Sequence, residues 1–317
     1  IQDAYNNVVT STVNVVLSIN TGVGTLNGTT TVAAVAGVAT FNSININEAG
    51  TFILDVDSTG LTTDTSPGFA ISPAAASVAV LTTPAPDFTA GGSSNQTIQI
   101  QDPFGNLITT DSTTQVTYSP TLSGAVTAVV VGTNVAGTGA PGATRTVQVA
   151  GGISTITLED TVAETFEVAF SNNGGLSNPA NDSIIVSVAA AAKVSLTGAG
   201  SNFVVGGSTT VSVQVQDTYN NLITTDSTTQ ITLTPTLAGQ ISGVTVGTNI
   251  SGTGAPGANR VVEVAGGIAA VTVTHLVIQT FEIAFINDGG YLNPANDSID
   301  SLAVSVDGAG VMVGFIF

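Results

Sequence analysis

The sequence predicts an all-β protein made of three tandem antiparallel β-sandwiches, the first of them incomplete. Three observations lead to this fold class. An internal repeat runs through the chain, apolar residues alternate with a period of two, and turn residues separate the alternating segments. Nothing between these segments is typical of a crossover helix, so antiparallel sheets packed face to face are the expected arrangement.

The repeat is clearest around one motif. The segment QIQDPFGNLITTDSTTQVT at residues 99–117 returns as QVQDTYNNLITTDSTTQIT at residues 214–232, an offset of 216 − 101 = 115 residues. IQDAYNN at the start of the chain is a third copy, in which Gln2 precedes Gln101 by 101 − 2 = 99 residues. The first copy is therefore shorter by 115 − 99 = 16 residues, which we assign to the glycine-rich GTNxxGTGAPG segment of the other two.

These copies set the predicted domain limits, with junctions at the small residues SPAAAS and AAAA. We expect an incomplete module without its opening strands, two complete modules and a C-terminal strand, at residues 1–74, 75–190, 191–306 and 307–317.

Apolar and polar residues alternate within each repeat. Val211, Val213 and Val215 alternate with Ser212 and Gln214, which is the pattern of a half-buried strand. Turn sequences such as NNGG, NDGG and GAPGA lie between such segments, at the spacing expected of a sandwich.

Composition excludes several partners. Only 3 Lys and Arg face 21 Asp and Glu, a net charge of −18, so nucleic acid and anionic membrane surfaces would be repelled. The chain has no cysteine for disulfides or thiolate metal sites, and no apolar run long enough to span a bilayer as a helix. With only 8% charged residues, hydroxyl and amide groups must solvate the surface. We expect a secreted, extracellular or cell-surface protein without membrane insertion.

The VQVQDTYNN opening, the Thr-rich strand after it, the closing AGxxTF strand and the Ala/Pro junction resemble the bacterial immunoglobulin-like (Big-type) repeats of surface proteins. The resemblance covers nearly the whole chain. It implies immunoglobulin-like sandwiches that serve as stalks, adhesins or subunits of filaments and envelopes, and it implies architecture more than activity.

The two ends of the chain are predicted to fit each other. Repeats two and three begin well before the motif, whereas Ile1 alone precedes it in the first repeat. After a closing strand expected at residues 302–306 comes DGAGVMVGFIF, an apolar surplus. Eight residues separate Gly207 from Gln216, and VMVGFIF plus the Ile1 of another copy also makes eight. A strand from another subunit is therefore expected to complete the first module.

The predicted contact has a donor and an acceptor. The acceptor residues are Ile1, Gln2 and Asp3. The donor strand is Val311, Met312, Val313, Gly314, Phe315, Ile316 and Phe317. Alternation puts Val311, Val313, Phe315 and Phe317 on one face and the others on the opposite face, and the sequence leaves open which face is buried.

The two matching ends predict a structural subunit of an extracellular filament or sheath that polymerises head to tail with itself. The alternative is a stalk or spacer fragment of a cell-surface adhesin, in which the tail continues into a further module of one covalent array. The mass of native material separates them, because an array would greatly exceed 31.3 kDa.

No catalytic residues are predicted. His275, the only histidine, falls in VTVTHLVIQTFEI, which is expected to be one strand, and its place in the second repeat is taken by Asp160. No GxSxG elbow is present, and the absence of Trp removes the usual sugar-binding platform of a glycosidase.

The shared aspartates allow two interpretations. Asp3, Asp102 and Asp217 fit an Asx-type turn in which the carboxylate accepts nearby backbone N–H groups. The rival is a calcium site that joins Asp102 to Asp111, and Asp217 to Asp226, because hard cations prefer oxygen ligands. No other cofactor is expected. A second pair of oxygen-rich loops is explained by turn formation; it comprises Asn172, Asn173 and Asp182 in one loop and Asn287, Asp288 and Asp297 in the other.

The sequence bears on two covalent modifications. Sequons for N-linked glycan occur at Asn27, Asn95, Asn181, Asn249 and Asn296. Lys193 is the only lysine, so isopeptide cross-links are unavailable to the first two modules.

Overall fold

A computed structural model of the chain describes residues 1–303, and every regular element in that range is a β-strand. Most strand pairings are antiparallel; the parallel ones include β7 with β15, β17 with β25, and the isolated bridges Val78 with Ser177 and Lys193 with Leu292. The all-β, antiparallel fold class is thus confirmed. No helix within the described range is long and apolar enough to cross a membrane.

The chain divides into two compact units. The first comprises Ile1–Pro86, Ser94–Glu159 and Phe166–Ile184, and the second comprises Asp87–Ser93, Asp160–Thr165 and Ile185–Phe317. The domain limits at residues 74, 190 and 306 stay predictions.

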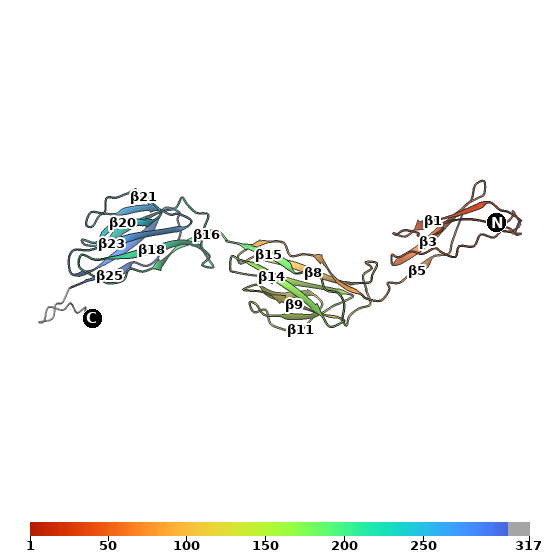
Figure 1. Ribbon diagram of the computed structural model, residues 1–317, viewed down its shortest axis with the longest axis horizontal. Helices are drawn as coiled ribbons and strands as arrows, with labels where there is room; N and C mark the ends of the chain where they lie inside the picture. The colour runs from red at the N-terminus through yellow and green to blue at the C-terminus, as the bar shows by residue number, and fades with distance from the viewer. Residues whose placement is uncertain (304–317) are drawn as a thin grey trace. The chain divides into compact units, whose positions relative to one another are not determined.

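The first repeat forms a single sheet in the order β2-β1-β3-β4, with β5 also paired to β3. Figure 1 labels β1, β3 and β5 of this sheet. Its strands are β1 (Asn14–Thr21), β2 (Thr31–Ala33), β3 (Gly50–Asp57), β4 (Asp64–Thr65) and β5 (Phe69–Ile71). Val15 of β1 and Phe52 and Leu54 of β3 are buried on this sheet. Phe52 and Leu54 are two residues apart, the spacing that places side chains on the same face of a strand.

The second repeat forms two sheets, in the orders β10-β13-β8-β6 and β11-β12-β9-β14-β15-β7. Its strands are β6 (Val78–Thr83), β7 (Phe88–Thr89), β8 (Ser93–Gln101), β9 (Gln115–Pro120), β10 (Ala125–Val131), β11 (Thr133–Ala136), β12 (Arg145–Gln148), β13 (Ile153–Glu159), β14 (Thr165–Asn172) and β15 (Asp182–Ser187).

The third repeat has the same arrangement, with sheets β16-β18-β23-β20 and β17-β25-β24-β19-β22-β21. Its strands are β16 (Ala191–Gly198), β17 (Phe203–Val204), β18 (Ser208–Asp217), β19 (Gln230–Pro235), β20 (Gln240–Val246), β21 (Thr248–Ser251), β22 (Arg260–Glu263), β23 (Ile268–Thr274), β24 (Gln279–Asn287) and β25 (Asp297–Leu302).

Side chains from both sheets fill one core in the third repeat. Val211, Val213 and Val215 of β18 are buried together with Ile231 and Leu233 of β19. β18 is an inner strand of its sheet, between β16 and β23. Its buried valines pack against the opposite sheet and exclude water from it.

One strand prediction for the third repeat was wrong. The segment VTVTHLVIQTFEI is not one strand: β23 ends at Thr274, and β24 begins at Gln279 after a bend over Leu276–Ile278. Because β-branched and apolar residues continue past the end of β23, period and propensity alone misplace this boundary. The last described strand is β25, and most of the closing strand expected at residues 302–306 lies outside the described residues.

Candidate functional site

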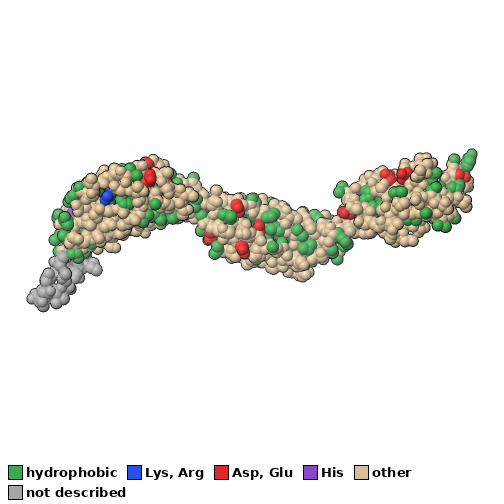
Figure 2. All heavy atoms as spheres, turned by 45° about the horizontal axis from the view of Figure 1, so that its top comes forward, with side chains coloured by type: hydrophobic (Ala, Val, Ile, Leu, Met, Phe, Trp, Pro, Cys, Tyr) green, Lys and Arg blue, Asp and Glu red, His purple; other side chains and the backbone are tan. Residues whose placement is uncertain are grey.

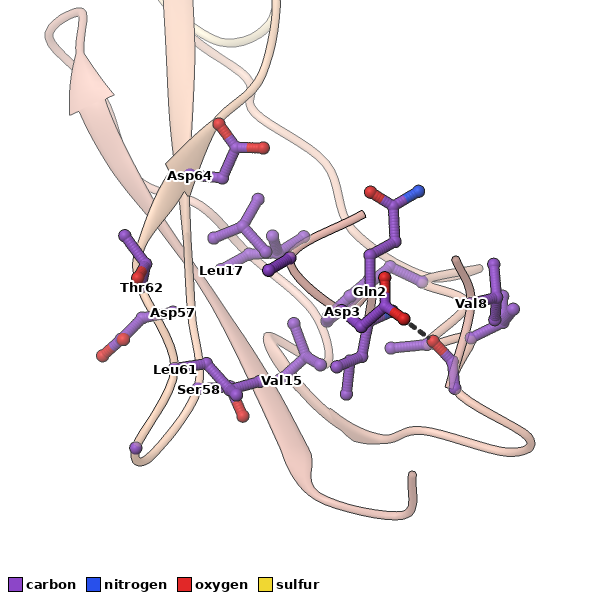
Figure 3. A pocket seen from close by; sticks show the side chains of 18 residues that line it. Gln2, Asp3, Val8, Val15, Leu17, Asp57, Ser58, Leu61, Thr62 and Asp64 are labelled. Atoms are coloured by element: carbon purple, nitrogen blue, oxygen red, sulfur yellow. Dashed lines mark hydrogen bonds between the residues drawn. The ribbon is translucent and has the colours of Figure 1, made fainter. Parts of the chain in front are cut away.

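The first repeat contains a groove of about 890 Å³ on its single sheet (Figure 3). Val15 and Leu17 of β1 and Val56 of β3 contribute apolar lining, and Leu61 reaches it from the loop after β3. The groove is also lined by Ile1, Gln2, Asp3, Ala4, Val8, Gly37, Val38, Ala39, Phe41, Asp57, Ser58, Gly60, Thr62 and Asp64.

The residues of the groove have covered counterparts in the third repeat. In strand register, Val15 and Leu17 of β1 hold the places of Ile231 and Leu233 in β19. Val15 pairs with β2 as Ile231 pairs with β22, and Leu17 pairs with β3 as Leu233 pairs with β24. There the side chains of β18 complete the core over them. The groove therefore lies where a strand equivalent to β18 would place its inward side chains.

One wall of the groove is a segment that forms no strand. Residues 38–44 correspond to β23, which pairs with β18 on one side and β20 on the other. In the first repeat the structure records only isolated bridges there, Val35 with Val38 and Asn27 with Asn45. Without a neighbouring strand, the backbone groups of residues 38–44 have no ladder to join.

Ile1 marks one end of this unpaired segment. Its terminal amine donates to the carbonyl of Gly37, as Ile100 N donates to Gly152 O and as Val215 N donates to Gly267 O. Ile1 thus takes the position of the residues that β8 and β18 present there. The predicted acceptor residues Ile1, Gln2 and Asp3 all line the groove, whereas the predicted donor residues 311–317 lie outside the described residues.

The three motif aspartates fold their loops in the same way. Oδ1 of Asp102 accepts the N–H groups of Phe104 and Asn106, and Oδ2 accepts the side-chain amide of Asn106. Asp217 makes the same bonds within its own loop, and so does Asp3, where Oδ1 and Oδ2 share the amide. The predicted Asx-type turn is confirmed at all three positions.

Two of these aspartates accept a further bond. Oδ2 of Asp102 accepts Ala74 N, and Oδ2 of Asp217 accepts Ala189 N. These two carboxylates are 1% and 0% exposed, whereas Asp3 is exposed. Asp3 has no such extra donor among the described residues.

Hydrogen bonding decides the charge state of these carboxylates. Burial pushes the pKa of Asp102 upward, but the bonds from Asn106, Ala74 and Phe104 outweigh it and lower that pKa to about 2. The same balance lowers the pKa of Asp217. The pKa of Asp3 is lowered chiefly by the Asn7 side chain.

The asparagine that ends each motif does more than close its loop. Asn106 Oδ1 accepts Ala49 N at 2.8 Å, and its Nδ2 donates to Asn47 O at 2.8 Å. Both partners belong to the repeat before it. The sequence motif includes this asparagine, but its bonds to another repeat were not foreseen.

The next motif repeats this arrangement. Asn221 Oδ1 accepts Ala163 N at 2.9 Å, and its Nδ2 donates to Thr161 O at 2.8 Å. Thr161 and Ala163 lie five and three positions before the buried Phe166, as Asn47 and Ala49 lie before the buried Phe52. In these two repeats the motif therefore connects neighbouring repeats, because its asparagine forms hydrogen bonds with the backbone of one loop of the preceding repeat.

Asp111 and Asp226, the other proposed calcium ligands, cap their own turns. Asp111 Oδ1 accepts the N–H groups of Thr113 and Thr114, and Asp226 makes the matching bonds to Thr228 and Thr229. Among residues 1–303 no group of three or more His, Cys, Asp or Glu could hold a metal ion. Calcium at these aspartates stays a prediction.

The second pair of oxygen-rich loops is built from turns. Asn172 Oδ1 accepts Gly174 N and Leu176 N, and Asn173 Oδ1 accepts Gln115 N. In the third repeat Asn287 and Asp288 accept backbone N–H groups in the same way. The remaining two aspartates accept a backbone N–H from the segment between the first two strands of their own repeat. Asp182 accepts Ala85 N, and Asp297 accepts Gly200 N.

His275 lies in the surroundings of a core residue. It is fully buried, its Nε2 lies 2.6 Å from Gln279 Nε2, and its ring lies 4.8 Å from that of Phe281. These neighbours supply neither a nucleophile nor a carboxylate.

The five sequons differ in accessibility. Asn95, Asn181, Asn249 and Asn296 are exposed, and Asn27 is half-buried. Attachment of glycan stays a prediction.

Comparisons with known proteins gave structural similarities alone. No family model matches the chain, and no curated protein sequence matches it. The structure of invasin, a bacterial integrin-binding protein, is similar at 12% identity over 97% of this chain and 57% of that one, with a TM-score of 0.36. This chain thus spans little more than half of the invasin chain.

Two further structures are similar at comparably low sequence identity and TM-score. The Escherichia coli adhesin FdeC is 15% identical over 95% of this chain and 89% of its own, with a TM-score of 0.38. Domains 4–9 of the surface layer protein SbsC are 14% identical over 96% of this chain and 42% of theirs, with a TM-score of 0.27. Similarities this distant do not extend any function of these proteins to this chain.

Proposed function

We propose that this protein is a structural subunit of an extracellular filament or sheath, in which the groove of the first repeat receives a β-strand from another copy. The observation that carries the proposal is the groove itself. It lies over Val15 and Leu17, beside residues 38–44, which correspond to a central strand and have no neighbour to pair with.

The proposed occupant is Val311–Phe317 of another copy. β18 pairs seven residues with β23, from Ser208 to Gln214, and the donor segment VMVGFIF is also seven residues long. The segment is uncharged and apolar, and it would pack on the apolar part of the lining, Val15, Leu17, Val56 and Leu61. The rest of the lining mixes polar and apolar residues. An added strand would supply the main-chain hydrogen bonds that residues 38–44 lack.

Burial of the donor side chains would make such a joint long-lived. Three or four large apolar side chains at about 1.5–3 kcal/mol each supply about 5–10 kcal/mol before ordering costs. Because the donor and the groove are different surfaces, each copy can give one strand and accept one, and the contact propagates into a fibre.

The surface fits a passive structural role. On the face drawn in Figure 2, backbone and uncharged polar side chains cover most of the area, and acidic side chains are scattered over it. Among residues 1–303 the described side chains form no catalytic constellation around His275. A mostly uncharged, hydroxyl- and amide-rich surface is compatible with the proposed structural role.

Asp substitutions on the two faces of the donor segment test the proposal. The subunit would be followed by electron microscopy and sedimentation as wild type, Phe315→Asp and Ile316→Asp. We expect one of the two variants to stay monomeric where wild type polymerises, and the affected face is the one that enters the groove. Unimpaired polymerisation of both variants would overturn strand exchange.

A longer covalent array is the competing outcome. In that case a strand of the same polypeptide would fill the groove, and native material would have an intact mass well above 31.3 kDa. The chain would then be a stalk or spacer of a cell-surface adhesin.

A further inference from the structure

The Asp217 loop touches the preceding repeat at two points. Asn221 bonds the backbone of Thr161 and Ala163, as described above. Tyr219 lies against Gly91: a Cβ atom on that glycine would be 1.9 Å from Tyr219 Oη. The missing side chain at Gly91 therefore leaves the space that the hydroxyl end of the Tyr219 ring occupies.

The third repeat carries the same two features, and no residue among 1–303 packs on the glycine or bonds the loop as Tyr219 and Asn221 do in the second repeat. Gly206 lies 206 − 91 = 115 residues after Gly91, and its N–H donates to His275 O as that of Gly91 donates to Asp160 O. A Cβ at Gly206 would meet no described atom within 4 Å. The seat that Tyr219 fills on Gly91 is open here.

The bend over Leu276–Ile278 is the second open feature. Leu276 and Ile278 lie five and three positions before the buried Phe281, so they correspond to Thr161 and Ala163. Their side chains are 66% and 63% exposed, and Val277 between them is 51% exposed. Neither backbone is hydrogen-bonded to another described residue.

The first repeat carries the matching loop, also without a partner. Tyr5, which corresponds to Tyr219, is 85% exposed. Asn7 donates to Asp3 and keeps its Oδ1 free of any partner among residues 1–303. Phe104, in the loop of the second repeat, is 57% exposed, and it is not among the atoms nearest the Cβ position of any described glycine.

We propose that the loop Asp3–Asn7 of one copy docks on the third repeat of a second copy. Tyr5 lies against Gly206, Asn7 Nδ2 donates to the carbonyl of Leu276, and Asn7 Oδ1 accepts the N–H of Ile278. The partner is therefore another molecule of this chain, recognised by the geometry that Asn106 and Asn221 already use within it.

This contact rests on the head-to-tail assembly proposed above and names its second set of residues. Leu302 O accepts Val205 N, so β25 brings the chain to its described end next to Gly206. The described chain therefore ends at the side of the third repeat that carries the docking surface. Two separate copies must be held together by the contact alone. The exposed apolar side chains of Leu276–Ile278 would bury more apolar area in that contact than Thr161 and Ala163 bury in the equivalent contact within one chain.

Cysteine cross-linking tests the contact, because the chain has no cysteine of its own. Equal amounts of Asn7→Cys and an affinity-tagged Ile278→Cys would be mixed under assembly conditions and oxidised. The double variant Asn221→Cys with Ala163→Cys, which joins the equivalent pair within one chain, is the positive control for the geometry. We expect the mixed disulfide dimer to exceed both homodimers.

Substitution of the aromatic ring gives a second readout. We expect Tyr5→Ala to weaken assembly about tenfold, as loss of a buried aromatic contact would. Phe104→Ala, the same change in a loop with no glycine seat, should assemble like wild type. Equal behaviour of the two variants would argue against the Tyr5 seat.

The outcomes separate this contact from strand exchange. Filaments that depend on the donor segment but give no mixed dimer would overturn the docking contact alone. A mixed dimer in chains whose assembly is indifferent to both donor-face substitutions would overturn strand exchange alone. If neither filaments nor mixed dimers form, both proposals are wrong.

Discussion

Asn221 accepts the N–H of Ala163 at 2.9 Å, and this one bond shows what the repeated motif is for. The aspartate before it folds the loop and holds the asparagine amide, and the amide then has one oxygen and one hydrogen left for another repeat. Asn106 accepts the N–H of Ala49 in the same way, so the motifs of the second and third repeats share this bond to the preceding repeat.

The worth of that bond can be measured on a monomer. Asn221→Ala removes the bonds to Thr161 and Ala163 and leaves Asp217 with fewer donors. We expect the free energy of unfolding, from urea denaturation, to fall by about 1–3 kcal/mol. Asn7→Ala is the matched control, because Asn7 makes the bonds to its aspartate but none to another repeat. Equal losses in the two monomeric variants would show that the bonds between repeats contribute nothing.

Substitution of two buried aspartates by asparagine should change the melting temperature at pH 7 in opposite directions. Burial, with the Glu164 charge nearby, raises the pKa of Asp160, so the folded chain holds this proton more firmly than the unfolded one. Its contribution to stability is present below the unfolded pKa of about 3.9 and is lost as the pH rises through the folded pKa. Asp160→Asn should therefore raise the melting temperature at pH 7, with a gain that disappears in acid.

Asp102 is the counterpart with a lowered pKa of about 2. Its stabilisation is present above the unfolded pKa and is lost as the pH falls through the folded value. Asp102→Asn should lower the melting temperature at pH 7, and the difference from wild type should shrink toward pH 2. Parallel pH profiles for both amidated variants would contradict these assignments.

The groove can be tested through Leu61, which lines it and is 45% exposed. Because the side chain is already partly in water, Leu61→Asp should leave the fold intact and slow polymer growth by placing a charge where an apolar strand must lie. Leu122→Asp, an exposed leucine of the second repeat, is the control and should polymerise normally. Light scattering during assembly measures both, and normal growth of Leu61→Asp would place the joint elsewhere.

Chelator distinguishes the turn from the calcium interpretation. The carboxylate of Asp102 already accepts four hydrogen bonds, two on each oxygen. We expect EDTA to leave the melting temperature of the full chain unchanged. A fall that added calcium reverses would support the cation site at Asp102 and Asp111.

Much of the fold could be read from the chain. Alternation at Val211, Val213 and Val215 gave the buried face of β18, because a strand turns successive side chains to opposite sides. The Asx turns at Asp3, Asp102 and Asp217 were also foreseen, since all of their bonds except the one to Ala74 or Ala189 are local. Local geometry is what a sequence pattern encodes.

The bend at Leu276–Ile278 shows where such reading ends. Its β-branched and apolar residues continue the strand pattern of β23, so the sequence predicts one strand through His275. Only the third repeat's packing ends the ladder at Thr274 and leaves those side chains outside the core.

By itself the sequence determined three repeats, an all-β fold class and loops closed by an aspartate. The tertiary structure decided which backbone groups and side chains remain unused once those loops and sheets have formed: residues 38–44 at the groove, the Asn7 amide, and the bend beside Gly206. Hydrogen-bond capacity is consumed by neighbours in space, and a sequence orders neighbours only along the chain.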